Sequence, residues 1–180
     1  LGGGPASGKS SAVKSGQVRI RRGTVTANAD DAKDALPEML EQMLKGNDSA
    51  AAFVHEESSD LAKRLLNEAL ESGSDVVLDG TGDGSIESLI KKIENAREHA
   101  PGKNTKVIGE YVTLDTDEAL RRAKIRGAKP FPEGGGRHVP DKILEDIHES
   151  VSRVFPQAAD IDLYDELRLF DNNVPFGDPP

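Results

Sequence analysis

The sequence contains no cysteine among its 180 residues. The chain can therefore form no disulfide bond and no thiolate metal site, and it has no cysteine nucleophile. This absence favours a reducing compartment, and we expect a cytoplasmic protein. No apolar run approaches the length of a membrane span and no signal peptide is visible, so a membrane location is not expected.

Positive charge is also in deficit, because 23 lysine and arginine residues face 32 acidic ones and the formal net charge is −9. Such a chain repels nucleic acids and anionic membranes at long range, and we expect neither as a partner. An anionic substrate would need a local basic cluster, and one lies in a single short stretch: Arg121, Arg122, Lys124, Arg126, Lys129 and Arg137. Charge alone explains this cluster equally well as a solvated helix face.

Internal repeats and a clear linker are absent as well. The hydrophobic content of 36% and the charged content of 31% are those of a well-solvated globular protein. The length is sufficient for one sizeable core, and we expect a single domain over residues 1–180.

What the sequence does contain is a complete phosphate-binding motif, G-x-x-x-x-G-K-S, at residues 3–10. Glycine is needed at its first and sixth positions because side chains there would hold the backbone away from a polyphosphate. Lys9 can reach the β- and γ-phosphates, and the Ser10 hydroxyl is placed to bind Mg²⁺. The motif predicts binding of ATP and Mg²⁺ by Gly3, Gly4, Pro5, Ala6, Ser7, Gly8, Lys9, Ser10 and Ser11.

Strand and helix patterns alternate after this motif. We expect strands at 24–28, 76–78, 106–114 and 167–170, and helices at 10–14, 33–44, 57–70 and 141–154, with two more around Ile86 to Ile93 and after Asp115 and Thr116, which can cap the second of them. This alternation predicts a doubly wound α/β fold of the P-loop NTPase type, with a mainly parallel sheet flanked by helices. The strand that normally precedes a phosphate loop has no room before Leu1, so we expect the first strand to be truncated.

Acidic residues follow two of the expected strands, where ligands bind in such folds. Asp30 and Asp31 follow the strand at 24–28, and a carboxylate there can accept a proton from a substrate hydroxyl, although a helix cap is an equally good interpretation. Asp79 ends the apolar strand at 76–78, where a carboxylate is costly unless it is paired or bound to a metal. It is therefore a candidate ligand for Mg²⁺.

Two further segments carry candidate polar groups. Arg137 follows three glycines on a loop that could bring positive charge to the γ-phosphate, or it is simply a solvated arginine. His55, Glu57 and Ser58 lie in a polar cluster at a helix start, where they could bind a polyhydroxylated substrate or only cap the helix. No second ligand accompanies His55 and Glu56 at helical spacing, which excludes a zinc site there, and His138 and His148 have no convincing partner.

Taken in order, these segments resemble the zeta toxin family of P-loop kinases over nearly the whole chain. The segments that carry the resemblance are GGPASGKS at 3–10, NADDAK at 28–33 with Pro37 beyond, VHEESS at 54–59, VLDGTG at 77–82, GRHVP at 136–140 and LRLFD at 167–171. Spacing from Pro37 matches Asp30, rather than Asp31, to the family's catalytic aspartate.

The resemblance implies transfer of the γ-phosphate of ATP to a hydroxyl of a nucleotide sugar, with UDP-N-acetylglucosamine as the expected acceptor and an antitoxin as a possible partner. It implies that Asp30 is the base, that Asp79 and Thr81 hold the substrate or the metal, and that Arg137 stabilises the transferred phosphoryl group. A second family arginine corresponds to Arg122 or Arg126, while ungapped spacing selects Lys124.

The sequence departs from the family at the end of the strand at 76–78, where Asp79 replaces the glutamate of some members. The substrate-facing segment also varies within the family, and some relatives phosphorylate nicotinamide dinucleotides or small antibiotics. The alternatives are therefore a kinase for another hydroxylated metabolite, a nucleotide-dependent regulatory ATPase, or a noncatalytic binding module.

Overall fold

The computed structural model describes residues 1–47, 50–100, 102, 105–128, 139–178 and 180. Its strands are β1 (Val25–Asn28), β2 (Val76–Asp79), β3 (Ile108–Thr113) and β4 (Glu166–Asp171). Its helices are α1 (Lys9–Lys14), α2 (Ala29–Ala35), α3 (Pro37–Leu44), α4 (Ala50–Phe53), α5 (His55–Glu71), α6 (Ile86–His99), α7 (Thr116–Gly127) and α8 (Asp141–Asp160).

The strands form two parallel pairs, β1 with β2 and β3 with β4. The first two residues of the chain lie between the pairs. Leu1 exchanges main-chain hydrogen bonds with Leu78 and Gly80 on one side, and Gly2 exchanges them with Glu110 and Val112 on the other. The spatial order is thus β1, β2, residues 1 and 2, β3, β4, and the prediction of a parallel α/β fold is confirmed.

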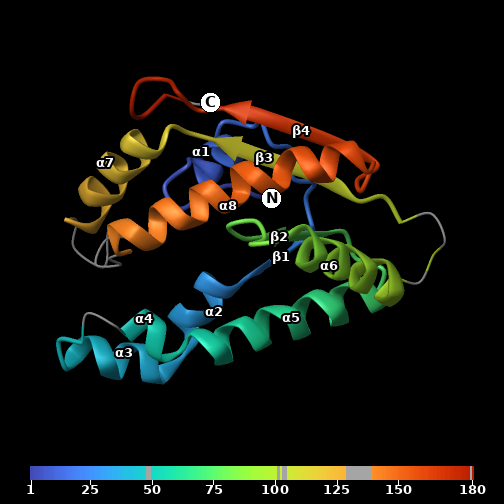
Figure 1. The fold of residues 1–180 in the computed structure, drawn as a ribbon. Helices are drawn as coiled ribbons and strands as arrows, with labels where there is room; N and C mark the ends of the chain where they lie inside the picture. The colour runs from blue at the N-terminus through green and yellow to red at the C-terminus, as the bar shows by residue number, and fades with distance from the viewer. Residues whose placement is uncertain (48–49, 101, 103–104, 129–138, 179) are drawn as a thin grey trace.

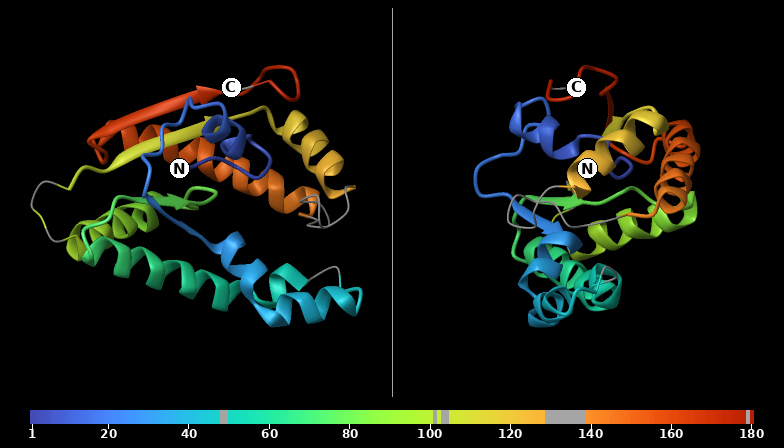
Figure 2. Two further views of the ribbon diagram at one scale, coloured as in Figure 1. Left: turned by 180° about the vertical axis from the view of Figure 1, so that it is seen from behind. Right: turned by 90° about the vertical axis from the view of Figure 1, so that its left-hand side faces the viewer.

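Helices cover both faces of this arrangement (Figure 1). Neighbouring strand residues point to opposite faces: the Tyr111 ring contacts Phe155 of α8 on one face, and Val112 packs with Ala12 of α1 on the other. Helix α5 packs against β1 and β2 through Leu66 and Leu70, and the rear view shows α5 running below this strand pair (Figure 2).

The prediction of one helix at 33–44 is wrong, because the helical segment begins earlier and is divided into two helices. Asn28 caps a helix that begins at Ala29, because its side-chain oxygen accepts a hydrogen bond from the Asp30 amide at 2.7 Å. Pro37 then disfavours helical geometry at Leu36, which is extended with φ −81° and ψ 123°, and the pattern is divided into α2 and α3. Asp30 consequently lies in the first turn of a helix.

The other expected elements are confirmed, with boundaries that differ by a few residues. Helix α8 runs beyond the expected end at residue 154 and includes Pro156. Asp115 holds the N-cap position of α7, but its side chain makes no capping hydrogen bond. None of the helices in the described part of the chain is both long and apolar enough to cross a membrane.

Candidate active site

The phosphate loop runs from the central residues of the sheet into α1. Gly3 and Gly8 have φ values of +138° and +99°, which glycine adopts far more readily than other residues. A Cβ atom at Gly3 would lie 2.5 Å from the main-chain oxygen of Val112. Glycine at this position is therefore required by the packing of the loop as well as by access to a phosphate.

Lys9 begins α1 and turns back over the loop. Its ammonium group donates hydrogen bonds to the main-chain oxygens of Gly3 at 2.8 Å and of Gly4 at 3.4 Å. Burial lowers the pKa of Lys9, the carboxylate of Asp79 opposes this effect, and the positive charge of Arg126 adds to it. Lys9 thus lies where the charges of β2 and α7 both act.

Asp79 ends β2 beside Asn28, its partner in the register of β1 and β2. Its Oδ2 atom accepts a hydrogen bond from Asn28 Nδ2 at 3.2 Å. Its Oδ1 atom is buried and has no hydrogen-bond partner among the described residues. Burial raises the pKa of Asp79, although Lys9 opposes the shift. A buried carboxylate oxygen without a hydrogen-bond partner costs folding free energy. Its position fits a metal ion or a metal-bound water.

Asp30 is held in the first turn of α2. Lys33, one turn later, places its ammonium nitrogen 3.0 Å from Asp30 Oδ1. The Lys33 side chain is only 11% exposed, whereas that of Asp30 is 56% exposed. Lys33 therefore holds the Asp30 carboxylate through Oδ1, while the Asp30 side chain remains exposed. The charge of Asp30 also acts on Lys9 and Asp79, so the three groups belong to one site.

The two candidate arginines of α7 lie in different surroundings. Arg126 is exposed and its charge acts on Lys9. Arg122 is only 6% exposed and donates to Glu118 and to the main-chain oxygens of Asn172 and Val174. The expectation that Arg122 contacts the phosphates does not fit this position. Lys124 pairs with Asp141 at 3.0 Å, which leaves Arg126 as the residue of α7 that interacts electrostatically with the loop.

The expected substrate residues also differ in their exposure to solvent. His55 and Glu57 are exposed in the first turn of α5, whereas Ser58 is 0% exposed and its hydroxyl donates to the His55 main-chain oxygen at 2.9 Å. Ser58 is thus buried within α5, and its expected contact with substrate stays a prediction. Thr81 is exposed after β2, and its main-chain oxygen accepts a hydrogen bond from the Gly3 amide at 3.2 Å.

Ser10 and Ser11 are exposed in the first turn of α1. Arg137, the expected phosphoryl-stabilising arginine, lies outside the described residues, as do Lys129 and His138. Its expected role stays a prediction.

Two buried side chains that are not among the candidate site residues contact the main chain of the phosphate loop. His148 of α8 places Nε2 2.9 Å from the Pro5 main-chain oxygen, and Asn172 after β4 donates from Nδ2 to the Ser7 main-chain oxygen at 2.6 Å. His148 follows the buried Leu144 by four residues, which indicates only a core position. Asn172 directly follows a strand at its carboxyl end, and the rule that located Asp79 would also have located this residue.

Comparison with known proteins gives a family match and a structural match that agree. The family model described as zeta toxin matches residues 1–174. The fold is similar to a solved structure from the PezAT chromosomal toxin-antitoxin system of Streptococcus pneumoniae, with a TM-score of 0.73 and 15% sequence identity. The match covers 96% of this chain but only 65% of that chain. No curated protein matches the sequence.

Proposed function

The chain belongs to the zeta toxin family of P-loop kinases, and from this membership we propose that it transfers the γ-phosphate of ATP to a hydroxyl group of a small molecule. The observation that carries the proposal is the convergence of Lys9, Asp30 and Asp79, whose charges act on one another at the phosphate loop. A cation for the phosphates, a carboxylate for a metal and an exposed carboxylate for a proton are the groups that phosphoryl transfer requires.

We assign the nucleotide to the loop at residues 3–10. The loop amides and the Lys9 ammonium bind the donor phosphates, and the Gly3 and Gly4 oxygens hold that ammonium at the loop. Ser10 and the buried oxygen of Asp79 that lacks a hydrogen-bond partner in the described part of the chain fit Mg²⁺ or its waters. The metal would offset the charge of the phosphate oxygens when it is bound.

In the transfer step, Asp30 accepts the proton of the acceptor hydroxyl. The hydroxyl oxygen forms a bond to the γ-phosphorus, the bond from that phosphorus to the β,γ-bridging oxygen breaks, and ADP leaves. Arg126, whose charge acts at Lys9, offsets negative charge on the transferred group, and we assign the same task to Arg137. Lys33 keeps the Asp30 carboxylate in place during the step.

For the acceptor we propose a nucleotide sugar, with UDP-N-acetylglucosamine as the first candidate. The support is family membership together with the exposed His55 and Glu57 on α5, which packs against the helix that carries Asp30. Thr81, exposed next to the loop, is the third expected contact. We further propose cytoplasmic action and an antitoxin partner. A nicotinamide dinucleotide is the alternative acceptor, and a regulatory ATPase is the alternative function.

The test is transfer from γ-labelled ATP to a panel of nucleotide sugars and dinucleotides, with Lys9→Ala as the control. Labelled UDP-N-acetylglucosamine that disappears in the Lys9 variant would support both the reaction and the acceptor. Label on a dinucleotide alone would retain the kinase and replace the acceptor. Slow hydrolysis that no acceptor changes would favour the regulatory ATPase.

A further inference from the structure

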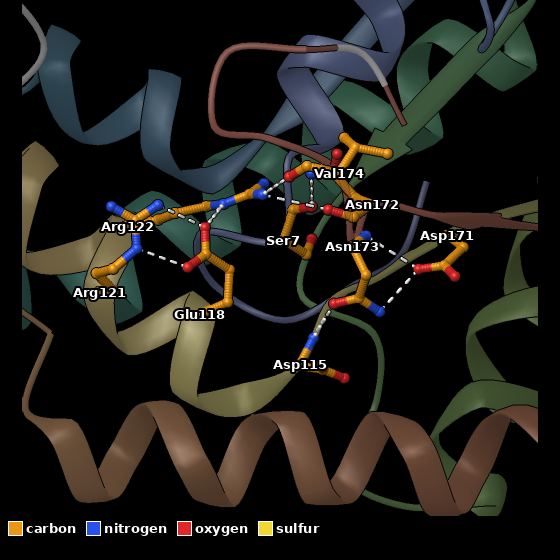
Figure 3. A network of polar contacts seen from close by, with 9 residues as sticks. All are labelled: Ser7, Asp115, Glu118, Arg121, Arg122, Asp171, Asn172, Asn173 and Val174. Carbon is orange, nitrogen blue, oxygen red and sulfur yellow. Dashed lines mark hydrogen bonds and ion pairs between the residues drawn. The ribbon is translucent and has the colours of Figure 1, made fainter.

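The segment that follows β4 connects three parts of the molecule that are distant in sequence (Figure 3). Asn172 donates from its side chain to the Ser7 oxygen of the phosphate loop at 2.6 Å and from its main chain to the Thr113 oxygen of β3 at 2.9 Å. Asn173 accepts a hydrogen bond from the Asp115 amide at the start of α7, at 2.9 Å. The loop, the end of the sheet and α7 therefore meet at two consecutive residues.

Arg122 fixes the same segment from the middle of α7. Its Nη2 atom lies 3.2 Å from the Asn172 oxygen and 2.7 Å from the Val174 oxygen, while its Nε atom donates to Glu118 at 2.7 Å. Hydrogen bonds from Arg121 and Arg122 lower the pKa of Glu118 to about 2. Only a guanidinium group offers several donors in a rigid planar fork, so lysine cannot reproduce this set of contacts.

The Asn172 amide lies directly beneath the loop. The residue is 1% exposed, and a Cβ atom at Gly8 would lie 2.1 Å from Asn172 Nδ2. Loss of that donor would leave the buried main-chain oxygen of Ser7 without this partner, at a cost in free energy. The Asn172 side chain therefore fixes the position of the main chain at Ser7 and Gly8, immediately before Lys9.

We propose that Asn172 and Arg122 are positioning residues that hold the phosphate loop and α7 in one fixed arrangement. Arg126 lies four residues after Arg122, on the same side of α7, so the anchoring of Arg122 also sets where Arg126 stands relative to Lys9. Neither Asn172 nor Arg122 needs to touch a substrate for this role. The inference rests on the proposed function, because it concerns the affinity of the loop for a nucleotide.

The test measures the affinity of the full chain for ATP with Mg²⁺ by calorimetry, without an acceptor. Asn172→Asp removes the donor and places a carboxylate against the Ser7 oxygen, and we expect binding about tenfold weaker or worse. Asn95→Asp is the matched control, since Asn95 donates an amide hydrogen bond to Asn67 at 2.9 Å between α6 and α5. It should leave ATP affinity unchanged.

Arg122→Lys is the second variant, because it keeps the positive charge and removes the planar set of guanidinium donors. We expect a higher KM for ATP, a lower kcat and an unchanged KM for the acceptor. A role in folding alone would lower the melting temperature of either variant and leave both ATP constants as in the wild type, which would overturn the inference.

The inference and the proposed function fail in different ways. A folded wild-type chain that does not bind ATP would refute the proposed function and the inference with it. A wild type that binds ATP and an Asn172→Asp variant that binds equally well would refute the inference alone. If circular dichroism shows that Asn172→Asp does not fold, Arg122→Lys decides, and wild-type affinity in that variant overturns the inference.

Discussion

The partly buried carboxylate of Asp79, whose Oδ1 atom is fully buried, makes the stability depend on pH. Burial raises the pKa of Asp79 above its ordinary value of 3.8, so the folded state binds this proton more tightly than the unfolded chain. Stability therefore falls as pH rises from the ordinary value to the raised one, and the penalty is complete above it. We expect Asp79→Asn to melt higher than the wild type at neutral pH, with a difference that shrinks on acidification.

Thermal melts across this pH range, without nucleotide, check the prediction. The control is Asp178→Asn, which changes an exposed carboxylate near the end of the chain and should leave the melting temperature unchanged at every pH. Equal melting temperatures for Asp79→Asn and the wild type at neutral pH would mean that the carboxylate carries no burial penalty.

We expect Lys33 to act on the proposed reaction through Asp30. In Lys33→Gln the carboxylate loses the ammonium group that holds it at 3.0 Å, and we expect kcat to fall by about tenfold or more with unchanged ATP affinity. Lys63→Gln is the matched control, because Lys63 forms an exposed ion pair with Asp60 at the same helical spacing. A steady-state comparison in which both variants keep the wild-type kcat would remove Lys33 from the site.

At this scale the sequence predicts the residues whose role follows from local chemistry. The loop glycines, Lys9 and Asp79 are found because a motif or a strand end identifies them. The sequence does not distinguish Arg122 from Arg126, because the difference depends on which part of α7 lies against a segment about fifty residues later. His148 was missed for the same reason, since it contacts the loop from a remote element, whereas the position of Asn172 at the end of a strand would have located it.

At the scale of single elements, the start of α2 connects the fold to the site. Asn28 caps the helix with its oxygen and donates to Asp79 with its nitrogen. Asn28→Ala should therefore cost about 1 to 2 kcal/mol of unfolding free energy and also reduce phosphoryl transfer. Chemical denaturation and initial rates measure the two effects.

Ser85→Ala is the control for this prediction, because Ser85 caps α6 by accepting a hydrogen bond from the Ser88 amide at 3.2 Å. It should cost a similar free energy while transfer stays at the wild-type rate. If both variants lose transfer equally, the effect of Asn28 is one of stability and not of the site.

The division of α2 from α3 shows why this part of the fold was predicted incorrectly. Apolar spacing at Leu36, Leu40 and Leu44 continues through Pro37 and suggests one helix, although Pro37 restricts the residue before it. The sequence indicates a helix cap near Asp30 only as an alternative to a catalytic role. In the structure the two interpretations coexist, because the cap is what places Asp30 in the first turn.

For the whole molecule, we propose that residues 1–180 form one cooperative domain. The strand pairs β1–β2 and β3–β4 are joined through Leu1 and Gly2, and α6 links them by packing against both α5 and α8. Calorimetry should give one transition whose measured enthalpy equals its van't Hoff enthalpy. Two separated transitions would divide the chain between the strand pairs.

The general architecture could be predicted from the alternation of strands and helices, but the order of the strands could not. Sequence patterns give each strand separately, whereas the order depends on contacts such as those of Gly2 with Glu110 and Val112. That order brings the ends of β2 and β4, with Asp79 and Asn172, to opposite sides of the phosphate loop.

The central claim is that Asp30 is the base of a kinase, while Lys9 and the loop amides at the same site bind the nucleotide. The most direct measurement compares Asp30→Asn with the wild type for ATP affinity and for transfer from γ-labelled ATP. We predict an ATP affinity within about twofold of the wild type and a loss of transfer of about a hundredfold or more, because the amide cannot accept the proton. Transfer at the wild-type rate in a variant that binds ATP normally would contradict the account.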